Sequence, residues 1–181
     1  MNPSETFYIS PIIRGTLSLF YIALLLPLPF LAQMTGGASP VWMGAGMTLG
    51  MIALQGALSQ RVTVDDQAIR VEYPRWFPVF LVKSWSLPWS DITALKMRST
   101  GQGGIVYYLL SKSNEGYLLP MRIAGFTRLV KVVQEKTALD TKDVKPLSQP
   151  WMYIFLLIVT CFLLLIDVWS IWIATTQGIL R

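Results

Sequence analysis

Three long apolar segments constrain this chain more than any other feature of its sequence. Residues 15–34 and 41–58 contain no charged side chain, and residues 151–175 contain only Asp167. A helix needs about 20 predominantly apolar residues to cross a bilayer, and the prolines in the first segment are tolerated in membrane helices. We therefore predict three transmembrane helices at these positions, with a cleaved signal peptide as an alternative for the first.

The placement of positive charge predicts the orientation of the chain. Thirteen of the fifteen Lys and Arg residues lie between residues 61 and 145, and the turn 35–40 has none. Because basic residues near span ends stay on the cytoplasmic side, we expect the N-terminal tail 1–14 and the central segment to be cytoplasmic or stromal. The C-terminus is expected on the opposite side of a bacterial inner or thylakoid membrane. The net charge of +5 is a mild excess that suits a lipid bilayer partner, and no nucleic acid is expected.

The central segment is patterned as short strands followed by one helix. Residues 61–65 and 68–73 alternate and flank the turn Asp65–Gln67, which predicts a hairpin. In the strand expected at 92–98, the side chains of Ile92, Ala94, Lys96 and Arg98 are expected on one face. Residues 125–139 have apolar side chains at helical spacing. The fold class is therefore a membrane protein of the α+β type, with an antiparallel sheet or small barrel capped by a C-terminal helix. Further strands are expected at 84–87, 92–98, 105–111 and 117–121. The strands and the helix together form a domain at 60–140, and a linker at 141–150 joins it to the third predicted span.

This order of elements resembles the bacterial pleckstrin-homology-like (PH-like) domain. The likeness covers residues 60–140 and lies in VTVDDQAIRVEY, LPWSDITALKM, IVYYLLSKSNEGYLLPM and the final helix, with Leu87–Ile92 as its most specific part. The layout of two spans before such a domain also resembles the photosystem I assembly factor of cyanobacteria and chloroplasts. That family has Arg-Trp followed by Phe-Pro, as residues 75–78 do here, although this chain adds a third span.

The sequence offers few residues for catalysis. It has no histidine, and its one cysteine, Cys161, lies in a predicted span. A histidine triad, a histidine base and a histidine-ligated metal are therefore excluded. We expect no enzyme activity, no cofactor and no metal.

Three groups of residues are candidates for binding. Residues 73–89, YPRWFPVFLVKSWSLPW, are rich in aromatic side chains. Trp89 is assigned to the core, and an exposed loop is predicted to dock on a partner through Arg75, Trp76, Phe77 and Phe80. The small residues Gly46, Gly50, Ala53 and Ala57, together with Asp167, are predicted to make helix–helix contacts. For Asp167, a structural position at the membrane interface beside Trp169 and Trp172 is the alternative. The basic residues that would bind lipid headgroups are Arg70, Lys83, Lys96 and Arg98, with Arg75 also among them.

These features favour a non-enzymatic accessory or assembly factor, or a small subunit, that docks on a membrane protein complex. A photosynthetic complex of the thylakoid is one candidate partner, by the second resemblance. An anionic-lipid-binding PH-like module is the first alternative, and part of a transporter is the second.

Overall fold

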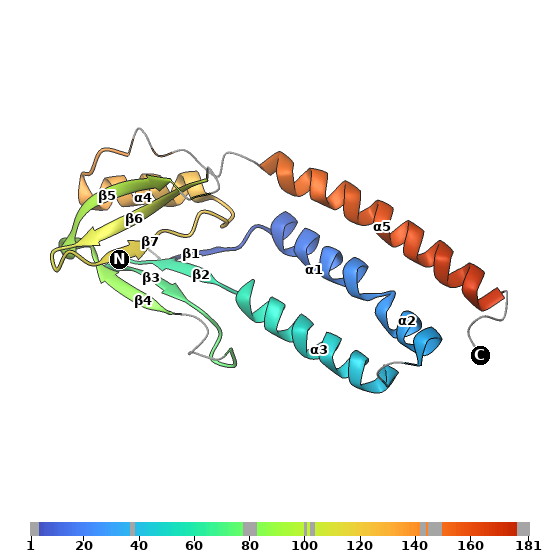
Figure 1. Ribbon diagram of the computed structural model, residues 1–181. Helices are drawn as coiled ribbons and strands as arrows, with labels where there is room; N and C mark the ends of the chain where they lie inside the picture. The colour runs from blue at the N-terminus through green and yellow to red at the C-terminus, as the bar shows by residue number, and fades with distance from the viewer. Residues whose placement is uncertain are drawn as a thin grey trace. The chain divides into compact units, whose positions relative to one another are not determined.

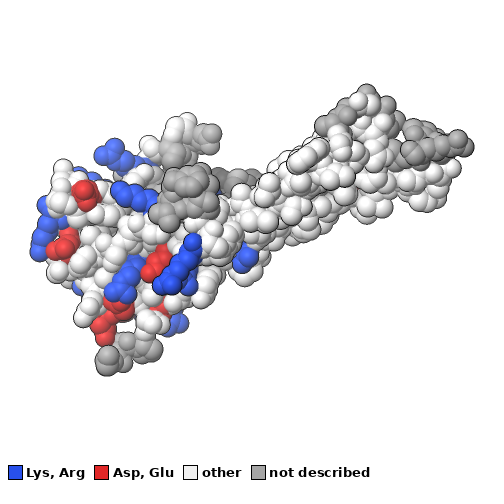
Figure 2. All heavy atoms as spheres, turned by 90° about the horizontal axis from the view of Figure 1, so that it is seen from below, with Lys and Arg blue, Asp and Glu red and all other residues white. Residues whose placement is uncertain are grey.

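The computed structural model describes residues 4–36, 39–77, 83–99, 101, 104–141, 144 and 150–176. The chain divides into two compact units. We term Met1–Ser10 with Ser59–Ser148 the sheet unit, and Pro11–Leu58 with Gln149–Arg181 the helical unit. Charged side chains spread over the sheet unit, whereas the helical unit is almost free of them in the view of Figure 2.

The described residues of the sheet unit form two antiparallel sheets and one α-helix (Figure 1). Phe7, Ile69, Leu109 and Leu129, from both sheets and the helix, belong to a single hydrophobic core. The unit is therefore an α+β fold. The strand order in the first sheet is β1 (Glu5–Tyr8), β2 (Arg61–Val64), β3 (Ala68–Glu72) and β4 (Trp85–Pro88). A 3₁₀ turn, η1 (Trp89–Asp91), connects β4 to the second sheet, whose strand order is β5 (Ile92–Ser99), β6 (Ile105–Ser111) and β7 (Gly116–Leu118). Helix α4 (Phe126–Thr137) follows β7 in the chain.

Helix α4 matches the periodicity of its sequence. Phe126, Leu129, Val130 and Val133 are all buried in the core, as the spacing i, i+3, i+4, i+7 predicts. The helix begins after Gly125, whose φ of 80° is a left-handed conformation that glycine adopts without strain.

Strand β1 corrects the prediction that residues 1–14 are a tail. Glu5–Tyr8 pairs antiparallel with β2, from Glu5 opposite Val64 to Tyr8 opposite Arg61. Phe7 enters the core, and Ile9 forms an isolated bridge with Ile123. The alternation of buried Phe7 and Ile9 with exposed Tyr8 is a strand signal, but it spans too few residues to stand out before a long helix.

The turn between β2 and β3 is built on Asp65. One carboxylate oxygen accepts hydrogen bonds from the backbone N–H groups of Gln67 and Ala68, both at 2.8 Å. The other oxygen pairs with Arg70 at 2.7 Å. The hydrogen bond from Gln67 is the largest of the causes that hold the pKa of Asp65 below its ordinary value of 3.8, because each favours the ionised form.

Asp65→Ala is expected to destabilise the sheet unit by about 1–2 kcal/mol at neutral pH, as loss of a similar capping carboxylate does. Because the pKa of Asp65 is lower in the folded state, this stabilisation is complete above pH 3.8, the ordinary pKa of the group. It is lost as the pH falls through the pKa of Asp65 in the folded state. Urea unfolding of the full chain in mild detergent, followed by tryptophan fluorescence, measures both effects. Asp65→Asn keeps a hydrogen-bond acceptor that does not titrate, so this variant is expected to lack the loss of stability at low pH that Asp65 causes. Unchanged stability of Asp65→Ala at neutral pH would contradict this role.

The helical unit consists of α1 (Pro11–Leu25), α2 (Leu28–Thr35), α3 (Pro40–Ala57) and α5 (Pro150–Thr176). Helix α1 packs against both α3 and α5 (Figure 1). The first predicted span is thus divided into α1 and α2, because Pro27 and Pro29 lack the N–H groups that would continue the helix.

Two helical stretches of the described chain, Pro11–Gln33 and Trp151–Thr176, are long and apolar enough to cross a membrane. Only 11% and 6% of their most apolar windows are buried within the chain, so neither resembles the core helix of a soluble protein. Helix α3, the second span predicted, is not one of the two. Its glycines and Gln55 lower its mean hydropathy.

Candidate functional sites

The aromatic segment near residue 76 presents one exposed tryptophan on a buried support. Residues 74–77 form a turn in which the N–H of Phe77 donates to the carbonyl of Pro74 at 3.0 Å. Trp76 is 57% exposed and Arg75 is also exposed. The Trp76 ring meets the Phe77 ring edge-on, with centroids 5.8 Å apart. This edge-on geometry is favourable for aromatic pairs, so the exposed ring rests against a buried one.

Phe77 corrects the prediction of a fully exposed aromatic loop. Its side chain is only 5% exposed and stacks on Tyr73 at 6.4 Å. The hydroxyl of Tyr73 accepts a hydrogen bond from Gln60 at 2.7 Å. Adjacent side chains in the turn point in different directions, so Trp76 faces outward while Phe77 supports it. Phe80, the fourth predicted docking residue, lies outside the described residues.

Only part of the predicted small-residue face of α3 contacts another helix of the chain. A Cβ on Gly50 would meet the ring of Tyr21 on α1, with Tyr21 Cζ at 3.1 Å. The hydroxyl of Tyr21 donates to the carbonyl of Met47 at 2.8 Å. By contrast, a Cβ on Gly46 would meet nothing within 4 Å, and Ala53 and Ala57 are exposed. Gly50 is therefore the residue of this set at which α1 and α3 approach closely.

Asp167 lies on the same face of α5 as two buried residues. Tyr153 and Thr160 precede it at successive seven-residue steps and are 6% and 0% exposed. Helix α5 packs on α1, where Thr16 is also buried. One carboxylate oxygen of Asp167 is enclosed, with no hydrogen-bond partner among the described residues. The residue thus belongs to the packed side of α5.

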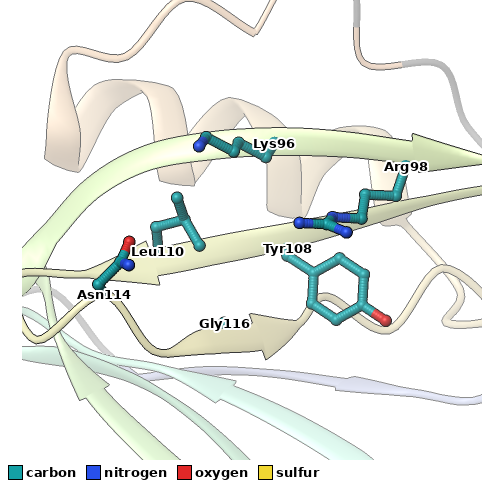
Figure 3. Close-up of a pocket in the computed structure, with 6 residues that line it drawn as sticks. All are labelled: Lys96, Arg98, Tyr108, Leu110, Asn114 and Gly116. Carbon is teal, nitrogen blue, oxygen red and sulfur yellow. The ribbon is translucent and has the colours of Figure 1, made fainter.

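The four predicted headgroup residues do not form one site. Arg70 is paired with Asp65, and Lys83 lies two residues before β4, a strand of the first sheet. Lys96 and Arg98, in contrast, lie together on β5. They line a hollow of ≈ 440 Å³ on the second sheet. Figure 3 labels the residues that line it: Lys96, Arg98, Tyr108, Leu110, Asn114 and Gly116.

Strand pairing creates this hollow. Lys96 lies opposite Tyr108 on β6, and Leu110 lies opposite Gly116 on β7. The register shifts between Ile92 and Ala94, so the predicted common face of residues 92–98 is wrong for Ile92, which enters the core. A bulge of this kind re-aims the side chains that precede it. Ala94, Lys96 and Arg98 keep the outer face.

The described residues contain no group of three or more His, Cys, Asp or Glu side chains that could hold a metal ion. Cys161 is free and exposed on α5.

Antiparallel sheets around one core, joined to long apolar helices, define the chain as an α+β protein with candidate membrane helices. It is 50% identical to uncharacterized protein slr0269 of Synechocystis sp. (strain ATCC 27184 / PCC 6803 / Kazusa), over 162 residues that cover 88% of this chain and 81% of the relative. The chain therefore belongs to the same family as that protein. No protein-family model matches the chain, and no solved structure matches it.

Proposed function

We propose that this chain is a non-enzymatic integral membrane protein whose sheet unit docks on a membrane protein complex, as an accessory or assembly factor or as a small subunit. The observation that carries the membrane part is an apolar stripe along α5. Seven large side chains recur on it at alternating steps of four and three residues, and each is 60–69% exposed: Trp151, Phe155, Ile158, Phe162, Leu165, Trp169 and Trp172.

Apolar side chains in a stripe of this length must be shielded from water by lipid or by another protein surface. A monomeric soluble protein rarely leaves so large a continuous apolar surface in contact with water. A helix of 27 residues rises about 40 Å, which exceeds a hydrocarbon core of about 30 Å. The tryptophans at both ends of the stripe suit the two interfaces of a bilayer. Lipid is therefore the cover that fits the length and the composition of α5.

The pairing of β1 with β2 supports three spans. Because Glu5–Tyr8 and Arg61–Val64 are neighbours in one sheet, the chain must leave and return to the same side of any membrane between them. If Pro11–Gln33 crosses, α3 must cross back, and its 18 residues rise about 27 Å. With the positive-inside rule, the N-terminus and sheet unit are cytoplasmic or stromal, and the C-terminus is on the other side.

Docking is assigned to Trp76 and Arg75. Tryptophan and arginine are the residue types most enriched at interface hot spots. The Trp76 ring is already held against Phe77, so a partner pays little side-chain entropy to bind it. The seven strands and the C-terminal helix suit a PH-like module. A photosystem complex of the thylakoid is a candidate partner because of the resemblance that residues 75–78 and the N-terminal helices carry.

Trp76→Ala is expected to lower recovery of the partner complex by about tenfold or more, as loss of a hot-spot tryptophan does. The tagged chain would be expressed in its native host, the membranes washed with alkaline carbonate, and the pellet solubilised in gentle detergent. Proteins captured with the tag would be quantified by mass spectrometry. Met97→Ala is the matched control, because Met97 is 60% exposed on the same unit, and it should recover the complex as wild type does.

The two halves of the proposal fail separately. Release of the chain into the carbonate wash would contradict membrane insertion. Equal recovery of the complex by wild type, Trp76→Ala and Met97→Ala would contradict docking through Trp76, as would capture of no defined complex by wild type.

A further inference from the structure

The hollow on the outer face of the second sheet holds positive charge that no carboxylate of the described residues pairs with. Five ion pairs link described residues, and they occupy Glu5, Asp65, Asp66, Glu72 and Asp91. None of those carboxylates lines the hollow. Within the described part of the chain, neither Lys96 nor Arg98 has an ion-pair partner. Two neighbouring cations without an acid favour an anion from outside the chain.

The acid closest in sequence to the hollow is directed elsewhere. Glu115 follows Asn114 in the turn that joins β6 to β7, and its carboxylate accepts a hydrogen bond from the hydroxyl of Tyr117 at 2.7 Å. Side chains alternate along a strand, so Tyr117 lies on the opposite face of β7 from Gly116, and the Glu115 carboxylate is hydrogen-bonded to the Tyr117 hydroxyl. The carboxylate therefore does not compete for the cations of the hollow.

Polar donors surround the two cations. In Figure 3, the Lys96 and Arg98 side chains extend along the face above Leu110 and Tyr108, and Asn114 lies at one end. Among the described residues, the side chains of Tyr108 and Asn114 have no hydrogen-bond partner within the chain, and both line the hollow with the two cations. An ammonium, a guanidinium, a phenol and an amide can together donate to several oxygens of one ligand.

Gly116 makes room for that ligand. A Cβ at this position would lie 3.5 Å from Tyr108 Cδ1 and 3.8 Å from Leu110 Cδ2, which are ordinary contact distances. A side chain there would therefore enter the hollow without colliding with the sheet. The absence of one leaves a floor of Leu110 and the Tyr108 ring beneath the cations, and the volume of ≈ 440 Å³ is within the range of small-ligand sites, about 300–1,000 Å³.

We propose that this hollow is a binding site for a phosphate-bearing anion, held by Lys96 and Arg98 with Tyr108 and Asn114 as neutral donors. A phosphate group has enough oxygens to engage an arginine fork and a lysine ammonium at once. Phosphate chemistry can come from a lipid headgroup or from a soluble phosphate. The site is independent of the Trp76 docking surface, because it lies on the other sheet and shares no residue with it.

The test uses the full chain in nonionic detergent and isothermal titration calorimetry with two probes. Inorganic phosphate is the soluble probe. Short-chain phosphatidylglycerol below its micellar concentration is the lipid probe, with short-chain phosphatidylcholine as its zwitterionic counterpart. Lys96→Gln/Arg98→Gln removes the charge. Gly116→Val fills the hollow and keeps both charges. Arg122→Gln/Lys131→Gln removes the same charge from exposed positions of the same unit.

We expect wild type to bind at least one phosphate probe saturably, and to bind phosphatidylcholine more weakly than phosphatidylglycerol. The charge variant and the filled variant should each bind about tenfold more weakly or worse, because each removes charge-assisted hydrogen bonds or the space for them. The control should bind within about twofold of wild type, since distant exposed charges are screened.

The outcomes distinguish a lipid headgroup from a soluble phosphate, and a built site from diffuse positive charge. Binding of phosphatidylglycerol alone identifies a lipid headgroup, and binding of inorganic phosphate as well identifies a general phosphate site. Unaltered binding by Gly116→Val would show that diffuse positive charge holds the anion and would overturn the proposal. Equal losses in the charge variant and its control, or no saturable binding of either phosphate probe by wild type, would also overturn it.

Discussion

Trp89→Ala is expected to destabilise the sheet unit by about 3–5 kcal/mol, the usual loss when a buried tryptophan is truncated. Trp89 is 7% exposed and belongs to the core that both sheets and α4 share. The change would remove a large apolar surface and leave a cavity that rigid strands cannot close. A small domain has a total stability of about 5–15 kcal/mol, so much of the sheet unit's stability would be lost.

One side-chain hydrogen bond adds to the expected loss. The indole N–H of Trp89 donates to the carbonyl of Asp65 at 2.9 Å, whereas the backbone N–H of residue 89, which donates to the carbonyl of Gln67 at 3.0 Å, is kept in the alanine variant. The ring therefore ties the connection between the two sheets to the β2–β3 turn. Its removal takes away this hydrogen bond to the Asp65 carbonyl, and a typical hydrogen bond contributes about 0.5–1.5 kcal/mol to stability.

Two control variants separate these contributions in denaturant unfolding of the full chain in mild detergent. Trp89→Phe keeps most of the ring but loses the N–H donor, so it is expected to lose far less stability than Trp89→Ala. Trp85→Ala truncates the half-buried tryptophan that lies 5.2 Å from the ring of Tyr117, and it should also lose less. If Trp89→Ala were no less stable than Trp85→Ala, Trp89 would not be the anchor of this core.

Local patterns in the sequence predicted the elements whose signals are short-range. The β2–β3 hairpin follows from two alternating runs around Asp65, and α4 follows from apolar spacing that the core confirms. Trp89 was assigned correctly to the core. Each of these depends on contacts within about a dozen residues or on burial of a very large side chain, and both kinds of signal are readable from one sequence.

Non-local pairing accounts for what was missed. Strand β1 is stabilised by β2, which lies more than fifty residues later in the chain. The shift at Ile92 depends on how β5 meets β6, and the inward turn of Phe77 depends on the Tyr73 ring. Lys96 and Arg98 were recognised as a basic pair on one strand face. Their meeting with Tyr108 and Gly116 required the register of three strands, which the sequence alone does not specify.

The second prediction concerns the helical unit, in which Gly50→Leu is expected to separate α1 from α3. A side chain at position 50 would enter the space of the Tyr21 ring, whose Cζ would be 3.1 Å from the new Cβ. Tyr21 would have to move and would lose its hydrogen bond to the carbonyl of Met47. Overpacking of this kind costs about 1–3 kcal/mol. The gain in helix propensity on replacing glycine, at most about 1 kcal/mol, offsets only part of it.

Gly46→Leu is the matched control, because it makes the same substitution one turn earlier on the same helix, where a new Cβ meets nothing within 4 Å. The full chain would be unfolded by SDS in mixed micelles and followed by circular dichroism. We expect Gly50→Leu to be less stable than Gly46→Leu, and Tyr21→Ala to relieve most of the difference, since it removes the ring that the new side chain strikes. Equal stability of the two leucine variants would mean that α1 and α3 do not pack through Gly50. Greater loss with Gly46→Leu would instead indicate that the exposed side of α3, which includes Ala53 and Ala57, contacts another helix in the assembled protein.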